Sequence, residues 1–156
     1  MRYVDQPTDC CSIARTVALA GDRWSTLILR DMSNGVHRFG DLATHLGIAR
    51  DVLTRRLNTL TDAGLVERRP YQEFGSRERH DYRLTAAGRD FVPVLIALMN
   101  WGDTHLAGPE GPPVRLYHTD CGAPIATEIR CAAGHTVAPG RAIHREFNPA
   151  AAERPS

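Results

Sequence analysis

Residues 39–64 read FGDLATHLGIARDVLTRRLNTLTDAG, and this stretch decides the fold. Its apolar residues have the spacing of a helix from Phe39 to Leu46, Gly47 interrupts that helix, and a second helix is expected from about Ala49 to Ala63. Two crossing helices need a small residue, a glycine at the turn and apolar residues that hold the second helix against the first. The sequence provides these in order as Ala43, Gly47, Ile48, Leu53 and Leu57. The stretch therefore predicts a helix-turn-helix.

A β-hairpin is expected directly after the helix pair. Leu65 to Arg69 alternates weakly, a polar segment with a glycine runs from Gln72 to Arg79, and Asp81 to Leu84 has the pattern of a returning strand. A helix-turn-helix followed by a hairpin is the winged form, in which the hairpin loop reaches along the DNA backbone or into the minor groove. The helix pair alone is a weak indication of DNA binding, and the hairpin strengthens it.

The second helix of the pair carries the residues that are expected to meet DNA. If Leu53, Leu57 and Leu60 face inward, helical geometry turns the opposite side outward. The outward residues are Arg50, Asp51, Thr54, Arg55 and Asn58. Arginine reads guanine edges or holds phosphates, threonine contacts a thymine methyl or a phosphate, and asparagine bonds adenine or the backbone. The alternative, an ordinary solvated helix face, is less favoured because a hairpin follows.

An acidic residue on this helix and two arginines in the hairpin loop also bear on DNA binding. Asp51 complements the helix N-terminus and can orient Arg55, yet it repels phosphate unless it accepts from cytosine. In the hairpin loop, Arg77 and Arg79 lie beside a glycine and a serine. Arginines on a loop are usually only solubilising, but one hairpin beyond a recognition helix they are placed for phosphates or a narrow minor groove. We therefore expect both to contact DNA.

A long helix is expected from Ala86 to about Leu106, capped by Thr85, and its apolar surface is wide. One stripe consists of Phe91, Val94, Leu95, Leu98 and Met99, and Val92, Ile96 and Trp101 lie off it. A surface helix normally buries a single face, so a second copy of the chain is expected to cover the remainder. Pro93 is expected to bend the helix without preventing this packing. The resulting homodimer would read an inverted-repeat operator.

Composition limits the classes of function. The 156 residues allow one domain with a core and a modest appendage. No apolar run reaches the ~20 residues of a membrane-spanning helix, and residues 1–10 lack a secretory signal, so we expect a cytoplasmic protein without a membrane partner. The net charge is only +1, but all 19 basic residues are arginines, which grip phosphate or guanine. No phosphate loop, metalloprotease helix or nucleophile elbow occurs, so an enzyme is not expected.

Several motifs resemble one family in continuous order from Cys11 to Leu106. They are Cys11-Ser-Ile-Ala-Arg15, Gly21-Asp-Arg-Trp24 with Leu27-Ile-Leu-Arg-Asp31, Arg38-Phe39, Val52-Leu-Thr-Arg-Arg-Leu57, Gly64-Leu-Val66, and Tyr82-Arg-Leu-Thr85 with Gly88. In these motifs the chain resembles the HxlR family, relatives of the MarR-type regulators. The resemblance implies a winged-helix dimer that represses or activates nearby genes, commonly in response to electrophiles, oxidants or small metabolites.

The resemblance also singles out Cys11, because many relatives carry a cysteine at this place and some use it as a redox sensor. A short amphipathic helix is expected to begin here, capped by Asp9 or Ser12, and its N–H groups and Arg15 favour a thiolate whereas Asp9 opposes one. The alternative, a half-buried structural thiol, stays equally open. A disulfide with the adjacent Cys10 would be strained.

Residues 114–147 form an appendage that is expected to be β-rich, with Val114 to Tyr117 and Ile125 to Ile129 as candidate strands. It contains four soft ligands, which are His118, Cys121, Cys131 and His135. Their paired spacing suggests a zinc site in a ribbon-like fold, although His118 and Gly134 stand where paired Cys-x-x-Cys knuckles would have cysteines. The alternative is a metal-free appendage, and no other cofactor is expected.

Together these features predict a mainly α fold with a small β-hairpin wing, a winged helix-turn-helix, plus a short β-rich C-terminal appendage. The expected boundaries are 1–106 for the DNA-binding and dimerisation domain, 114–147 for the appendage and 148–156 for a disordered tail. The expected function is transcription regulation by a homodimer that binds double-stranded DNA and acts as a repressor. The homodimer is expected to respond to an oxidant, an electrophile or a small metabolite. The alternative is a winged-helix adaptor that binds proteins without specific DNA binding.

Overall fold

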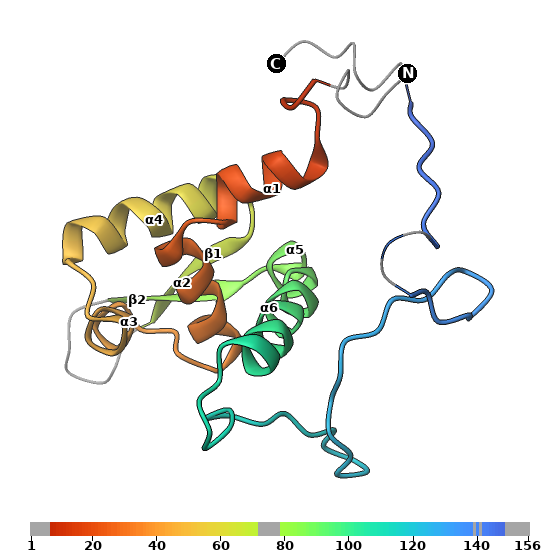
Figure 1. Ribbon diagram of the computed structural model, residues 1–156. Helices are drawn as coiled ribbons and strands as arrows, with labels where there is room; N and C mark the ends of the chain where they lie inside the picture. Colours follow the sequence, from red (N-terminus) through yellow and green to blue (C-terminus); the bar gives the residue numbers. More distant parts are fainter. Residues whose placement is uncertain (1–6, 72–78, 139, 141, 149–156) are drawn as a thin grey trace. The chain divides into compact units, whose positions relative to one another are not determined.

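The computed structural model describes residues 7–71, 79–138, 140 and 142–148. Internal contacts divide the chain into two units between Val92 and Pro93. The first unit contains α1 (Ser12–Ala20), α2 (Arg23–Ser33), α3 (Phe39–Leu46), α4 (Arg50–Asp62), β1 (Val66–Tyr71), β2 (Arg79–Leu84) and α5 (Ala86–Asp90) (Figure 1). This succession of helices and an antiparallel hairpin confirms the predicted winged helix-turn-helix.

Helix α2 begins after Asp22 and ends at Ser33. The Asp22 carboxylate accepts hydrogen bonds from the backbone N–H groups of Trp24 and Ser25, at 3.0 and 3.2 Å, and so caps the helix. Burial works against ionisation of Asp22, but hydrogen bonds from Ser25 and Trp24 and the charge of Arg56 hold the pKa of its carboxyl below the usual value. Arg56 lies on α4, 3.4 Å from the carboxylate, so the cap also links α2 to α4.

The helix-turn-helix consists of α3 and α4, separated by a tight turn at Gly47. This residue has a φ of 60°, a left-handed conformation that glycine adopts at little cost. Leu53, Leu57 and Leu60 of α4 are completely buried, as predicted, together with Leu42 of α3. Helix α2 packs against both helices. The packing of one side of α4 into this core leaves its other side at the surface.

A buried carboxylate joins α2 to α3. Asp31 is 2% exposed, and its oxygens accept hydrogen bonds from the Arg30 guanidinium at 2.6 and 2.9 Å and contact Nδ1 of His45 at 2.6 Å. A buried charge is tolerated where such partners surround it. The arrangement fixes the last turn of α3 against the end of α2, and thereby helps to position the helix-turn-helix.

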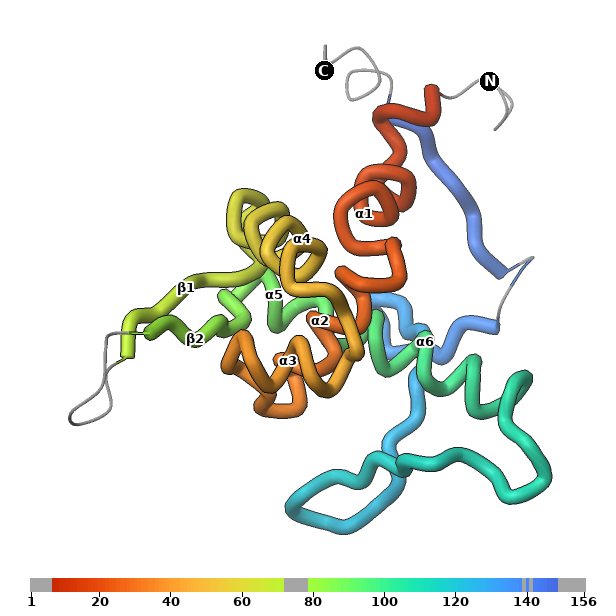
Figure 2. Tube along the Cα trace, turned by 90° about the vertical axis from the view of Figure 1, so that its left-hand side faces the viewer, coloured from red at the N-terminus to blue at the C-terminus, as the bar shows by residue number. Residues whose placement is uncertain are grey.

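The two strands form an antiparallel hairpin that projects from the helices of the first unit (Figure 2). Its register runs from Val66 opposite Leu84 at the base to Tyr71 opposite Arg79 at the outer end. Val66 and Leu84 are buried, so only the base of the hairpin belongs to the core. Arg79, predicted in the loop, is instead the first residue of β2.

The expected long helix is in fact two helices, α5 and α6 (Val92–His105). Thr85 caps α5 with its side chain, as predicted. Phe91 ends α5, and Pro93 is the second residue of α6. Proline has no N–H to donate to the Arg89 carbonyl, and its ring clashes with that turn. The helix therefore breaks at this place, whereas the sequence analysis predicted only a bend.

The second unit, Pro93–Asn148, consists of α6 and the appendage. By its contacts α6 groups with the appendage, whereas the sequence analysis assigned residues up to 106 to the DNA-binding domain. After α6, the described residues contain no further helix or strand, only two turns closed by isolated bridges, Tyr117 with Pro124 and Arg130 with Thr136. The expected pairing of 114–117 with 125–129 is represented by one bond from the Ile125 N–H to the Leu116 carbonyl, at 2.9 Å.

Candidate nucleic-acid interface

The outward face of α4 has the composition and position that the sequence predicted. Its exposed residues include Arg50, Asp51, Thr54, Arg55 and Asn58. They lie opposite the leucines that α4 buries in the core. The prediction that these side chains point to solvent is confirmed, and their contact with DNA stays a prediction.

Two contacts organise this face. The Arg55 guanidinium lies 3.4 Å from the Asp51 carboxylate, one turn earlier, but the two side chains are 72% and 75% exposed. Such a solvent-screened pair is weak, so Arg55 remains available for a stronger acceptor. The Thr54 hydroxyl donates to the Arg50 carbonyl at 2.9 Å, which restrains its rotamer.

The hairpin supplies further basic side chains. Arg79 is exposed at the start of β2, whereas Arg77 lies outside the described residues. Arg68 of β1 donates to Nδ1 of His80 at 3.0 Å, across the two strands. The wing thus brings at least two guanidinium groups to the outer part of the hairpin.

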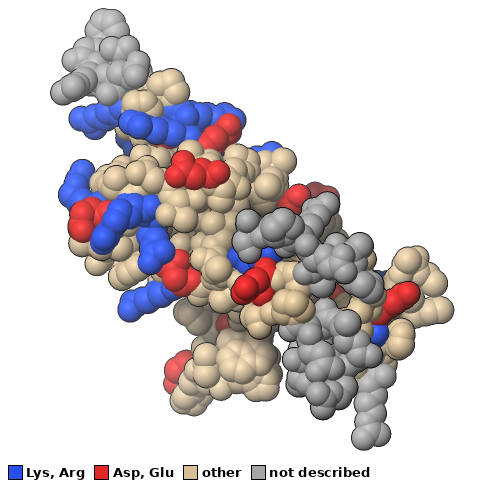
Figure 3. Space-filling model, turned by 90° about the horizontal axis from the view of Figure 1, so that it is seen from above, with Lys and Arg blue, Asp and Glu red and all other residues tan. Residues whose placement is uncertain are grey.

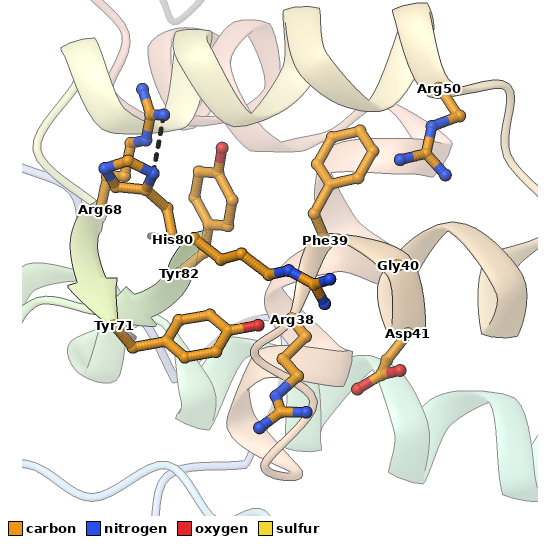
Figure 4. A pocket seen from close by; sticks show the side chains of 10 residues that line it. Arg38, Phe39, Gly40, Asp41, Arg50, Arg68, Tyr71, His80 and Tyr82 are labelled. Carbon is orange, nitrogen blue, oxygen red and sulfur yellow. Dashed lines mark hydrogen bonds between the residues drawn. The ribbon is translucent and has the colours of Figure 1, made fainter. Parts of the chain in front are cut away.

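A recess of about 600 Å³ lies between the first turns of α3 and α4 and the hairpin (Figure 4). We call it the arginine recess; its lining residues are Arg38, Phe39, Gly40, Asp41, Arg50, Arg68, Tyr71, Arg79, His80 and Tyr82. Among these described residues four arginines face one carboxylate, so the recess attracts anions. In a space-filling view, basic side chains gather on one part of the surface, with several acidic side chains between them (Figure 3).

Aromatic rings restrain two of the guanidinium groups in the arginine recess. The Cζ atom of Arg38 lies 5.1 Å from the centre of the Tyr71 ring, and that of Arg50 lies 5.0 Å from the centre of the Phe39 ring. A guanidinium over a ring is attracted to the π face and keeps its N–H groups directed outward in its own plane. Both guanidinium groups are thereby restrained in the lining of the arginine recess.

The sequence analysis missed Arg38, Arg68, Tyr71 and Tyr82 as candidate site residues, although it quoted two of them in family motifs. These residues come from separate segments that only the folded chain brings together. A signal was present in the hairpin, because Arg68 and Tyr82 each lie two residues from a buried strand residue, and alternation places both on one face.

Cys11 is the N-cap residue of α1 and is half-buried. Neither Asp9 nor Ser12 caps the helix, contrary to the expectation, because Cys11 itself has the extended backbone of the cap position and no side chain bonds there. The Cys10 thiol donates to the Pro7 carbonyl at 3.1 Å, and both cysteines are free. The expected place of Cys11 at a helix N-terminus is confirmed, and its sensor role stays a prediction.

Two of the four candidate zinc ligands lie together. Nδ1 of His118 is 3.2 Å from Sγ of Cys121, at a turn where Gly122 has a φ of 68°. Cys131 and His135 belong to the second turn, which a backbone bond of 3.0 Å between them closes. Within the described residues, which include all four ligands, no three His, Cys, Asp or Glu side chains form a group that could hold a metal ion. The predicted four-ligand site is not assembled, and zinc binding stays a prediction.

Helix α6 exposes apolar side chains. None of its residues is buried, and Val94 and Leu98 of the predicted stripe are 44% and 55% exposed. Leu95 and Met99 are half-buried, and Phe91 lies at the break before α6 rather than on it. No helix in the described part of the chain is long and apolar enough to cross a membrane. The apolar stripe predicted on α6 is thus partly exposed.

Sequence comparison identifies the family. The family model described as HxlR-like helix-turn-helix matches residues 19–109. An uncharacterised HTH-type transcriptional regulator of Mycobacterium tuberculosis (strain H37Rv) is 48% identical over 120 residues, which cover 77% of this chain and 75% of the relative. Another from Synechocystis sp. is 39% identical over 97 residues, 62% of this chain and 70% of the relative.

Solved structures agree with this assignment. The crystal structure of PA1607, a candidate transcription factor, has a TM-score of 0.78 at 34% identity, covering 88% of this chain and 95% of that one. The redox regulator HypR in its oxidised form has a TM-score of 0.56 at 25% identity, covering 63% of this chain and 100% of that one. These relatives are transcription regulators and not enzymes. On its fold, the exposed outer face of α4 and these likenesses, the chain is a helix-turn-helix transcription regulator that belongs to the HxlR-like helix-turn-helix family.

Proposed function

We propose that this regulator binds double-stranded DNA with the outward face of α4 in the major groove and represses transcription as a homodimer on an inverted-repeat operator. The observation that carries the DNA proposal is the exposure of Arg50 and Arg55, opposite the buried leucines of α4. An arginine at such a position can donate two hydrogen bonds to a guanine edge or hold a phosphate. An adaptor that binds only proteins would leave these arginines and the arginine recess without a role.

We expect Arg55→Ala to weaken operator binding by roughly 1–3 kcal/mol, because a bidentate contact to a base is lost. Fluorescence anisotropy measures this on a duplex that the parent protein selects from a random pool, and on a scrambled duplex of equal length. The loss should be larger on the selected duplex. Equal affinities of parent and variant for the selected duplex would exclude the α4 face, and binding that does not depend on salt would favour the adaptor.

The homodimer proposal is supported by exposed apolar side chains on two helices. Leu98 of α6 is 55% exposed, and Ile13 and Val17 of α1 are 72% and 57% exposed. Apolar side chains exposed one turn apart on the same helix, as Ile13 and Val17 are, commonly mark a contact with another chain. A two-fold pair of recognition helices reads half-sites about 34–36 Å apart, which requires an inverted repeat.

We also propose that Cys11 makes the regulator responsive to oxidants or electrophiles. Its place at the N-cap of α1 supports this, because the thiol there is only half-buried and is not held in a disulfide. The likeness to HypR, which is a redox regulator, supports it as well. Modification of this residue would act on the start of α1, where Ile13 and Val17 are exposed. The proposed sensor is thus adjacent to part of the proposed dimer surface.

Diamide or a quinone is expected to release DNA from the parent protein, and Cys11→Ser is expected to abolish this response. Cys10→Ser provides the matched control, because it removes a neighbouring thiol of equal size that is bonded to the Pro7 carbonyl. This variant should keep most of the response. Electrophoretic mobility shifts with and without oxidant measure the effect. A response in Cys11→Ser as large as in the parent would rule out Cys11 as the sensor.

A further inference from the structure

We propose that the arginine recess binds the sugar–phosphate backbone of DNA and thereby sets the register of α4 in the major groove. The inference rests on the proposed DNA binding, and it adds to that interface two arginines that the recognition face does not contain, Arg38 and Arg68. Backbone contacts of this kind orient a protein on the duplex without reading its sequence.

The position of the recess points to DNA as the source of the anion. Arg50 is the first residue of α4 and lines the recess, so the recess is continuous with the outward face of α4. On the opposite side, Arg68 and Tyr71 of the hairpin form its wall (Figure 4). A duplex that lies along α4 and reaches the hairpin passes over the recess, and the outermost atoms of a duplex are its phosphates.

The chemistry of the lining suits a phosphodiester. Arg38 and Arg50 are restrained by Tyr71 and Phe39, so less side-chain freedom is lost when their N–H groups bind oxygen. In Figure 4 the Tyr71 hydroxyl points toward the middle of the recess, where it can donate to a phosphate oxygen. Of the described lining residues Asp41 alone is a carboxylate, and the four guanidinium groups outweigh its charge.

The size of the recess also fits a segment of backbone better than a single anion. Its volume of about 600 Å³ exceeds what one phosphate group fills. The rings of Phe39 and Tyr82 add an apolar wall against which a deoxyribose can pack. A sugar with its two flanking phosphates would therefore use both the charged and the aromatic parts of the lining.

Arg68→Gln and Arg69→Gln form a matched pair for the test. Both remove one positive charge from β1, but Arg68 lines the recess, whereas Arg69 points to the other face of the strand and pairs with Glu67. For Arg68→Gln we expect the plot of log K against log [salt] to become shallower by about 0.9, which corresponds to an affinity about eightfold lower at about 0.1 M salt. The loss should be equal on selected and scrambled duplexes.

The controls separate folding from binding. Arg69→Gln should bind with the affinity and salt slope of the parent, and Arg38→Gln should reproduce the loss seen for Arg68→Gln. Thermal melting of each variant by circular dichroism should match the parent, since all are exposed surface changes. The assignment is overturned if Arg68→Gln and Arg38→Gln bind DNA with the same affinity and salt slope as Arg69→Gln.

A second measurement identifies the ligand atom. In a series of selected duplexes, each with one phosphate replaced by a neutral methylphosphonate, we expect one position that weakens the parent but no longer affects Arg68→Gln. If the loss of affinity from each methylphosphonate adds to the loss from Arg68→Gln at every position, the proposal is overturned.

Titration with inorganic phosphate in the absence of DNA tests whether the recess binds a free anion. Saturable binding that Arg68→Gln removes while DNA binding is unchanged would assign the recess to a free anion instead of the DNA backbone.

The outcomes distinguish this inference from the function on which it rests. If Arg55→Ala weakens operator binding and Arg68→Gln does not, the recess assignment fails and DNA recognition by α4 stands. If the parent binds no duplex with salt-dependent affinity, the proposed function fails and the recess assignment fails with it.

Discussion

Leu98→Arg is expected to convert the protein into a monomer that binds its operator roughly a thousandfold more weakly, the difference between specific and non-specific binding of many regulators. Leu98 is one of the more exposed apolar residues of α6, at 55%. If a second chain covers it, an arginine there places an unpaired charge in an apolar contact, which costs more than the contact contributes. A monomer then contacts only one half-site, with a single recognition helix.

Sedimentation velocity at micromolar concentration measures the first part of this prediction, and anisotropy on the selected duplex measures the second. Thr104→Arg is the matched control, because it adds the same charge to an exposed position of α6 away from Leu98. This control should sediment with the parent at twice the chain mass. A parent that sediments as a monomer and still binds a palindrome tightly would show that α6 is not the dimer contact.

The parts of the fold that follow from local signals were predicted closely. Helix α2 has ends that its flanking residues set locally, because Asp22 caps its start and Asn34-Gly35 closes it. Helix α3 has the predicted ends because Gly47 adopts the left-handed conformation that stops a helix. The inward and outward sides of α4 followed from helical spacing alone. In each case the deciding residues lie within a few positions of the element that they define.

Features that depend on tertiary structure were not predicted. The arginine recess combines residues from the segment before α3, the first turn of α4 and both strands, so no short window of sequence contains it. The Asp31–His45 pair joins residues on two helices, and neither residue is unusual in its own helix. The break at Phe91 was underestimated because the apolar pattern continues across it, although Pro93 removes the hydrogen bond that a bent helix would need.

Gly88→Ala is expected to destabilise the winged helix by about 3 kcal/mol, near the upper end of the usual cost of overpacking. A Cβ at this position would lie 2.1 Å from the Leu65 carbonyl oxygen and 3.1 Å from its carbon. Neither backbone moves easily, because the Gly88 N–H donates to the Thr85 hydroxyl at 3.1 Å and the Leu65 carbonyl accepts from the Thr85 N–H at 3.0 Å. The added methyl must therefore push α5 away from the base of the hairpin.

Thermal unfolding measures this effect, and a loss of about 3 kcal/mol lowers the midpoint by roughly 12–24 °C in a domain of this size. Gly40→Ala is the matched control, because Gly40 lies within α3 and no atom stands within 4 Å of the Cβ that would be added. Alanine is favoured over glycine inside a helix, so this variant should melt at the parent's midpoint or slightly above it. If Gly88→Ala melts at the same midpoint as the parent, α5 does not need a glycine to approach the Leu65 carbonyl at the base of the hairpin.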